Sequence, residues 1–238
     1  MSVAIVTGAA SAIGSAVATR LERDGWTVAR NELPGVGVNG HPAPADVADP
    51  AQVAEMVERV EEELGPVALL VNNAAAAAFG AIDELPERDF WQIIDVNLGG
   101  AFFCAQACTR SMVQRGFGRI ITLSSEWGQI GWVDATAYCA SKAGLISLTK
   151  ALARALGPSG ITVNAIAPSV VDTPRLQIDA DHNGIALDEM RRRYMTQIPL
   201  QRLARPEEIA SLVAFLASDT AATITGQLIC PNGGTTTT

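Results

Sequence analysis

The fold class is decided by residues 3–14, which read VAIVTGAASAIG. The apolar run Val3–Thr7 predicts a buried strand, and a helical period begins directly after it at Ile13. A glycine turn between a strand and a helix N-terminus presents backbone N–H groups and a positive dipole end to a pyrophosphate. We therefore predict a dinucleotide-binding turn, with an ordinary α/β turn as the alternative. Its cofactor-contacting residues are predicted to be Gly8, Ser11, Ile13 and Gly14.

Strand-like and helical segments alternate along most of the chain. This βαβ rhythm predicts an α/β fold with a doubly wound, mainly parallel sheet and helices on both faces. The strand segments are continuous apolar runs, as expected when both faces of a sheet are covered. The predicted strands are Val3–Thr7, Thr27–Asn31, Ala68–Asn72, Arg119–Ser124 and Thr162–Ala167; the predicted helices are Ile13–Arg23, Ala51–Leu64, Glu87–Arg115, Ala137–Leu156 and Glu207–Leu216.

Two segments depart from the rhythm. Leu33–Ala45 is rich in glycine and proline, and we interpret it as a connection that shortens or skips a helix. Residues 169–199 interrupt the pattern after a strand end and predict a substrate lid. Residues 1–238 are interpreted as a single domain that binds the dinucleotide and carries out catalysis.

Composition narrows the function class. Of the 238 residues, 48% are hydrophobic and 18% charged, and the net charge of −8 argues against a nucleic-acid or anionic-membrane surface. No apolar stretch reaches the ~18 residues of a membrane span, and the four cysteines form no disulfide framework. We predict a soluble, cytoplasmic protein that binds neither nucleic acid nor membrane.

The second strand ends at an acidic residue, Glu32. A carboxylate there accepts hydrogen bonds from the adenosine ribose hydroxyls and repels a 2′-phosphate, which favours NAD over NADP. Arg30 lies two residues earlier, on the same face of the strand. It could pair with Glu32 or contact a phosphate, so its effect on the NAD preference stays open.

Tyr138 and Lys142 are four residues apart in a chain with only two tyrosines and two lysines. In the helix predicted over Ala137–Leu156 this spacing places both side chains on one face. A phenol beside an ammonium group can donate and accept a proton near neutral pH. Cys139 points about 100° away around the helix and is assigned no role.

Taken together, these segments resemble the short-chain dehydrogenase/reductase family over essentially the whole chain. The resemblance implies a seven-stranded Rossmann-like sheet, an NAD(P) cofactor and a homotetramer or dimer formed through the helices at 87–115 and 137–156. It rests on Thr7-Gly8-x3-Ala12-x-Gly14, Asp46-Val47, Asn72-Asn73-Ala74, Asn97, Ser125, Tyr138-x3-Lys142, and Pro168 with Thr173.

The resemblance also implies roles for the catalytic residues. Tyr138 is expected to be the general acid or base, with its phenol pKa lowered by Lys142, which also binds the nicotinamide ribose. Ser125 is expected to hydrogen-bond the substrate oxygen, and Asn97 to hold a water next to Lys142. The remaining implied cofactor contacts are Asp46 and Val47 at the adenine, Asn73 and Ala74 at the adenosine ribose, and Val171 and Thr173 at the carboxamide. The reaction needs no metal, and the only histidines, His41 and His182, form no ligand cluster.

Four positions depart from the family pattern. Small residues stand there in place of the usual glycine or aspartate: Ala12, Ala75, Ser169 and Asn232. We expect these changes to alter cofactor affinity more than function.

The resulting prediction is an NAD-preferring oxidoreductase that interconverts a secondary alcohol and a ketone. One alternative is an NADPH-dependent 3-oxoacyl-type reductase, against which Glu32 and the acidic charge count. A halohydrin-dehalogenase-like lyase is disfavoured by Lys142, where those enzymes carry arginine, and by the small residues of Gly8–Gly14. A non-catalytic NAD-binding protein is disfavoured by the complete set of Ser125, Tyr138 and Lys142.

Overall fold

The sheet has seven strands, all parallel, in the order β3-β2-β1-β4-β5-β6-β7. This computed structural model describes residues 2–236. The central strands are buried along their whole length, because helices cover both faces. The strands are β1 Val3–Val6, β2 Thr27–Arg30, β3 His41–Pro42, β4 Val67–Asn72, β5 Gly118–Leu123, β6 Ile161–Ile166 and β7 Leu228–Ile229.

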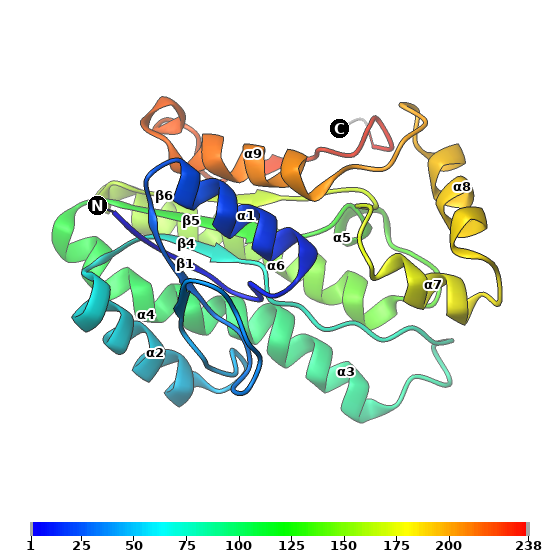
Figure 1. Ribbon diagram of the computed structural model, residues 1–238, viewed down its shortest axis with the longest axis horizontal. Helices are drawn as coiled ribbons and strands as arrows, with labels where there is room; N and C mark the ends of the chain where they lie inside the picture. The colour runs from blue at the N-terminus through cyan, green and yellow to red at the C-terminus, as the bar shows by residue number, and fades with distance from the viewer. Residues whose placement is uncertain (1, 237–238) are drawn as a thin grey trace.

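Two helical layers sandwich the sheet (Figure 1). One face packs against α2, α4 and α6, which contribute Met56, Cys104 and Ala153 to its core. The other face packs against α1 and α9, through Leu21 and Val213. The helices are α1 Ala12–Arg23, α2 Pro50–Leu64, α3 Glu87–Ile94, α4 Gly100–Arg115, α5 Trp127–Ile130, α6 Thr136–Leu156, α7 Leu176–His182, α8 Leu187–Gln197 and α9 Pro206–Ala217. No helix within residues 2–236 is both long and apolar enough to cross a bilayer.

The predicted fold class is confirmed, with differences at the edges of the sheet and in one helix. β3 and β7 have two residues each, too few for an apolar run, and β3 lies inside the segment 33–45 that was expected to be a plain connection. That segment contains no helix, as predicted. The helix expected over 87–115 is helical throughout, but it widens to a π-helix at Asp95–Gly99.

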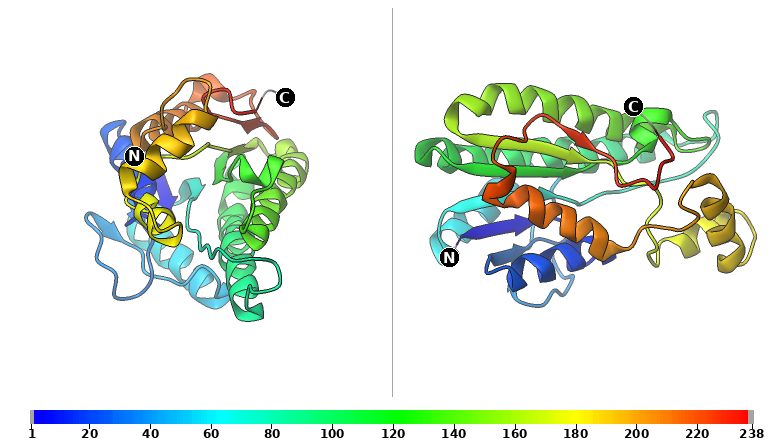
Figure 2. Two further views of the ribbon diagram at one scale, coloured as in Figure 1. Left: turned by 90° about the vertical axis from the view of Figure 1, so that its right-hand side faces the viewer. Right: turned by 90° about the horizontal axis from the view of Figure 1, so that it is seen from above.

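The strand order places an opening over the carboxyl ends of β1 and β4. Connections leave β1 toward β2 on one side and return to β4 on the other, and ligands of doubly wound sheets bind at such a switch point. Residues 169–199 project beyond these strand ends as α7 and α8 (Figure 2). The two helices share a small apolar core that includes Leu176, Met190 and Tyr194.

Candidate active site

The loop after β1 is shaped by two glycines. Gly8 has φ +62°, a conformation that favours glycine, and a Cβ there would lie 2.8 Å from Ala74 Cα. A Cβ on Gly14 would lie 2.2 Å from the Gly8 carbonyl oxygen. Ser11 caps α1: its Oγ accepts from Gly14 N at 3.1 Å and donates to Gly8 O at 2.7 Å. The loop therefore brings bare backbone to the N-terminus of α1, which is the arrangement that binds a pyrophosphate.

Gly14→Ala should destabilise the protein by about 1–3 kcal/mol, because backbone atoms of the loop would have to shift. Chemical unfolding measures the change. Gly37→Ala is the matched control, since a Cβ at Gly37 meets no atom of the described chain within 4 Å. Equal stability of the two variants would contradict the close packing of this loop.

Glu32 reaches the same loop from the end of β2. Its Oε2 accepts a hydrogen bond from Ala10 N at 3.0 Å. Arg30 does not pair with Glu32, which was one of the two possibilities left open. Its buried guanidinium is held by Glu22, with Nε and Nη2 donating at 3.1 and 2.9 Å, and it contacts Thr19. The Arg30 guanidinium group is thus already paired with a side chain of α1.

Asn73 hydrogen-bonds to the loop between β1 and α1 (residues 7–11), which we call the nucleotide loop. Its Nδ2 donates to Thr7 O at 2.9 Å, Gly8 O at 3.0 Å and Ser11 Oγ at 3.2 Å. These bonds hold the Asn73 amide against the loop, and its place beside the adenosine ribose stays a prediction. The Ala74 backbone N donates to Thr7 Oγ1 at 3.0 Å, which fixes the end of β4 beside β1.

Asp46 and Val47 follow β3 at the same end of the sheet. Asp46 Oδ1 accepts from Ala48 N at 2.9 Å, forming a turn that leaves the side chain half-buried. Val47 packs directly on Gly100 of α4, where an added Cβ would lie 2.7 Å from Val47 Cγ2. The predicted contacts of both residues with the adenine stay a prediction.

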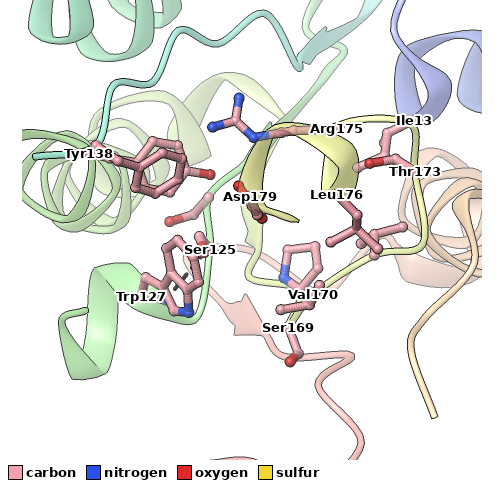
Figure 3. A pocket seen from close by; sticks show the side chains of 14 residues that line it. Ile13, Ser125, Trp127, Tyr138, Ser169, Val170, Thr173, Arg175, Leu176 and Asp179 are labelled. Carbon is pink, nitrogen blue, oxygen red and sulfur yellow. Dashed lines mark hydrogen bonds between the residues drawn. The ribbon is translucent and has the colours of Figure 1, made fainter. Parts of the chain in front are cut away.

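Tyr138 and Ser125 line one pocket of about 150 Å³, together with residues of the segment 169–199, the predicted lid (Figure 3). Ser125 follows β5, and its Oγ accepts from Trp127 N at 3.2 Å. Tyr138 lies in the first turn of α6. Ile13, in the first turn of α1, lines the same pocket, as do Val171 and Thr173. The pocket therefore joins the predicted reactive groups to the predicted cofactor site.

Lys142 lies one turn after Tyr138 and is almost fully buried. Its Nζ donates to Leu123 O at 2.7 Å and lies 5.4 Å from the centroid of the Tyr138 ring. Burial, and secondarily the charge of Arg175, lower the pKa of Lys142 to about 7. A buried ammonium at this position is therefore poised between its two protonation states at neutral pH.

The phenol of Tyr138 behaves differently from the expectation. Burial raises its pKa, while the charge of Arg175 and a hydrogen bond with Ser125 act to lower it. The net direction is therefore upward, opposite to the prediction for this phenol. Arg175, which the sequence pattern did not single out, is one of the groups that lower the pKa.

Asn97 lies in the π-helix between α3 and α4 and is buried. Its Oδ1 accepts from Ala76 N at 2.7 Å, and its Nδ2 donates to Ala76 O and to Ser141 Oγ, both at 3.0 Å. Ser141 Oγ in turn donates to Tyr138 O at 2.7 Å. Asn97 thus ties the segment after β4 to α6, and π-helical turns of this kind are frequent at functional sites.

Sequence reasoning missed three charged residues near Ser125 and Tyr138. Arg175 and Asp179 line the pocket from the lid, and Glu126 is buried beside it, with Oε1 accepting from Ser169 Oγ at 2.7 Å. Burial raises the pKa of both Asp179 and Glu126. Of these three residues, only Glu126 could have been expected near the site from the sequence, because it directly follows Ser125. Within residues 2–236, no three His, Cys, Asp or Glu side chains are grouped to hold a metal ion.

Known proteins similar to this chain are named as reductases and dehydrogenases. A family model described as enoyl-(acyl carrier protein) reductase matches residues 8–236. The 3-oxoacyl-[acyl-carrier-protein] reductase FabG of Staphylococcus aureus is 39% identical over 97% of this chain and 96% of its own length. The 3-oxoacyl-[acyl-carrier-protein] reductase FabG of Salmonella typhimurium is 37% identical over 98% of this chain and 96% of its own length. The ligand-free structure of Thermoplasma acidophilum aldohexose dehydrogenase superposes with a TM-score of 0.93 at 32% identity, covering 98% of this chain and 93% of that one.

Proposed function

This chain belongs to the short-chain dehydrogenase/reductase family of nicotinamide-dependent oxidoreductases, and we propose that it interconverts a secondary alcohol and a ketone with NAD(H) as preferred cofactor. The observation that carries the proposal is the pocket in which Ser125 and Tyr138 face the residues around Ile13. A cofactor laid along the nucleotide loop would end at these two hydroxyl groups.

The residues present fit a dinucleotide. Gly8 and Gly14 let the loop pack closely against Ala74 and against itself, which brings its backbone to the N-terminus of α1. Ser11, Glu32, Asp46, Val47, Ala74, Val171 and Thr173 would surround the remainder. Asn73 would line the adenosine ribose while its amide fixes the loop. When bound, the nicotinamide ring supplies the site that accepts or gives the hydride.

Tyr138 would move the proton. During alcohol oxidation the substrate O–H proton passes to the Tyr138 phenolate oxygen as the C–H bond breaks; during ketone reduction the phenol returns it. Ser125 Oγ would donate a hydrogen bond to the substrate oxygen and hold it at the phenol. Lys142 would bind the ribose and place a positive charge one turn from Tyr138. Asn97 would position α6 through Ser141.

The preference for NAD(H) is supported by the neighbours of Glu32. Its carboxylate lies at the loop where an adenosine ribose would sit, so a 2′-phosphate there would meet a like charge. Arg30, the nearby cation, is already paired with Glu22 and is turned toward α1. The Glu32 carboxylate would therefore favour NAD(H) over NADP(H).

Fluorescence titrations with NADH and NADPH test the proposal. NADH should bind the wild-type protein at least about tenfold more tightly, a difference of about 1.4 kcal/mol. Glu32→Gln should narrow this ratio, whereas Glu63→Gln, at an exposed position on α2, should not change it. Tighter binding of NADPH by the wild-type protein would contradict the assigned preference, and binding of neither would contradict the cofactor site.

An NADPH-dependent 3-oxoacyl reductase is the second candidate, because the FabG proteins share 37–39% identity over nearly the whole chain. A carrier-protein partner would need a basic docking surface. Two arginines of the lid helix α8 are already paired: Arg191 with Asp172 and Asp188, and Arg192 with Glu189. Faster turnover of acetoacetyl thioesters with NADPH than of any secondary alcohol with NAD⁺ would favour this candidate.

We also propose that residues 1–238 act as one domain whose segment 169–199 is the substrate lid, and that the protein is a cytoplasmic homo-oligomer, either a tetramer or a dimer. Exposed Trp91 on α3 and Phe102 on α4 support an interface along these helices. Four free thiols are compatible with a reducing compartment.

A further inference from the structure

A lid carboxylate is buried in the pocket with one oxygen unpartnered. Asp179 on α7 is 8% exposed and lines the pocket. Its Oδ2 accepts a hydrogen bond from the Tyr194 hydroxyl at 3.1 Å, but its Oδ1 has no hydrogen-bond partner within residues 2–236. A buried polar atom without a partner costs about 1–3 kcal/mol, so this oxygen is set to accept a hydrogen bond from a ligand.

A guanidinium group faces the same space. Arg175 lies one helical turn before Asp179 and also lines the pocket. The guanidinium carbon lies 5.5 Å from the centroid of the Phe79 ring, and no acceptor in the described chain takes a hydrogen bond or ion pair from this group. Figure 3 shows Arg175 and Asp179 turned toward the hydroxyl of Tyr138 and toward Ser125. A solvent-exposed guanidinium group without a protein acceptor and a buried carboxylate oxygen without a donor thus lie side by side next to the reacting groups.

We propose that Asp179 and Arg175 bind a hydroxyl group of the substrate, next to the carbon that Tyr138 and Ser125 act on, so that the substrate is a polyol, sugar or other hydroxylated alcohol or ketone. This rests on the proposed function, which it deepens. A hydroxyl group is the simplest group that donates to a carboxylate and accepts from a guanidinium at once. A carboxylate would be repelled by Asp179, and an ammonium group by Arg175.

The pocket wall suits such a substrate. Trp127 stacks on Trp132 at 4.8 Å between ring centroids and meets Tyr138 and Phe79 edge-on at 6.1 and 6.3 Å. Ligand sites typically combine such an apolar wall with a few polar groups that set orientation and specificity. A plain acyl chain would cover the wall but leave Asp179 unpaired. Sites built to bind a hydroxyl group discriminate strongly against analogues that lack it.

A matched pair of alcohols tests the proposal. Oxidation of trans-1,2-cyclohexanediol and of cyclohexanol is measured with NAD⁺, and their kcat/KM values are compared. The wild-type protein should prefer the diol by about tenfold or more, and Asp179→Asn and Arg175→Gln should each lower that ratio by about tenfold. The control is Asp181→Asn, two residues on and exposed, which should keep the wild-type ratio. Preference for cyclohexanol, or an unchanged ratio in Asp179→Asn, would overturn the proposal.

Binding can be measured without turnover. In the Tyr138→Phe protein loaded with NAD⁺, calorimetric titration should show saturable binding of the diol that Asp179→Asn weakens. Absence of diol binding, with NAD⁺ still bound, overturns the hydroxyl-binding site alone. Failure of the wild-type protein to bind NAD⁺, or undiminished turnover by Tyr138→Phe, overturns the proposed function itself.

Discussion

Tyr138→Phe should lower turnover by about 10³- to 10⁴-fold while the protein still binds NADH. The substitution removes one oxygen atom and leaves the ring, whose contacts with Trp127 help to form the pocket wall. The lost atom is the one that hydrogen-bonds with Ser125 and exchanges the substrate proton in the proposed reaction. Single-turnover kinetics and an NADH titration on the same preparation measure both effects.

Cys139→Ala is the matched control for this variant. Cys139 is the next residue on α6 and points about 100° away around the helix, so its removal should leave turnover near the wild-type value. Undiminished turnover in Tyr138→Phe would remove the proton-transfer role and would leave a binding protein or a different catalytic group. Loss of NADH binding in Tyr138→Phe would indicate a structural role for the phenol instead.

The reactive pair was predictable because its geometry is local. A helix of regular pitch fixes the relation of Tyr138 to Lys142 whatever surrounds it, and the predicted helix is present as Thr136–Leu156. The central strands were also predictable from local sequence, because a strand that is buried on both faces consists of consecutive apolar residues. Ser125 is placed by the end of such a strand.

Features that depend on distant partners were not predictable. β3 and β7 exist because neighbouring strands pair with them, so two residues suffice. Arg30 forms its ion pair with Glu22 on α1 and not with Glu32. This pairing depends on how α1 packs beside β2, which the local sequence does not contain. One of the charges that act on Tyr138 is that of Arg175, a residue distant in sequence. The pKa of the phenol follows from this arrangement and from burial, neither of which the spacing of two residues contains.

Lys142→Met should lower turnover by at least about 10²-fold and at the same time change how stability depends on pH. The first effect follows from loss of the cation next to Tyr138. The second follows because burial lowers the pKa of Lys142 to about 7 in the folded protein, against about 10.4 in an unfolded chain. Between these two values the unfolded state binds more protons than the folded state does.

Stability therefore rises with pH across this window, since the penalty for burying the ammonium group is full below about pH 7 and has vanished above about pH 10.4. Urea unfolding at intervals from about pH 6 to pH 9.5 should show the wild-type free energy of unfolding rising relative to that of Lys142→Met. Comparing the two proteins cancels the groups they share. Lys150→Met, at the exposed lysine of α6, should run parallel to the wild-type protein. Parallel curves for Lys142→Met as well would mean that the hydrogen bond to Leu123 O holds the ammonium charged at every pH tested, and that the chain folds around a permanent buried cation.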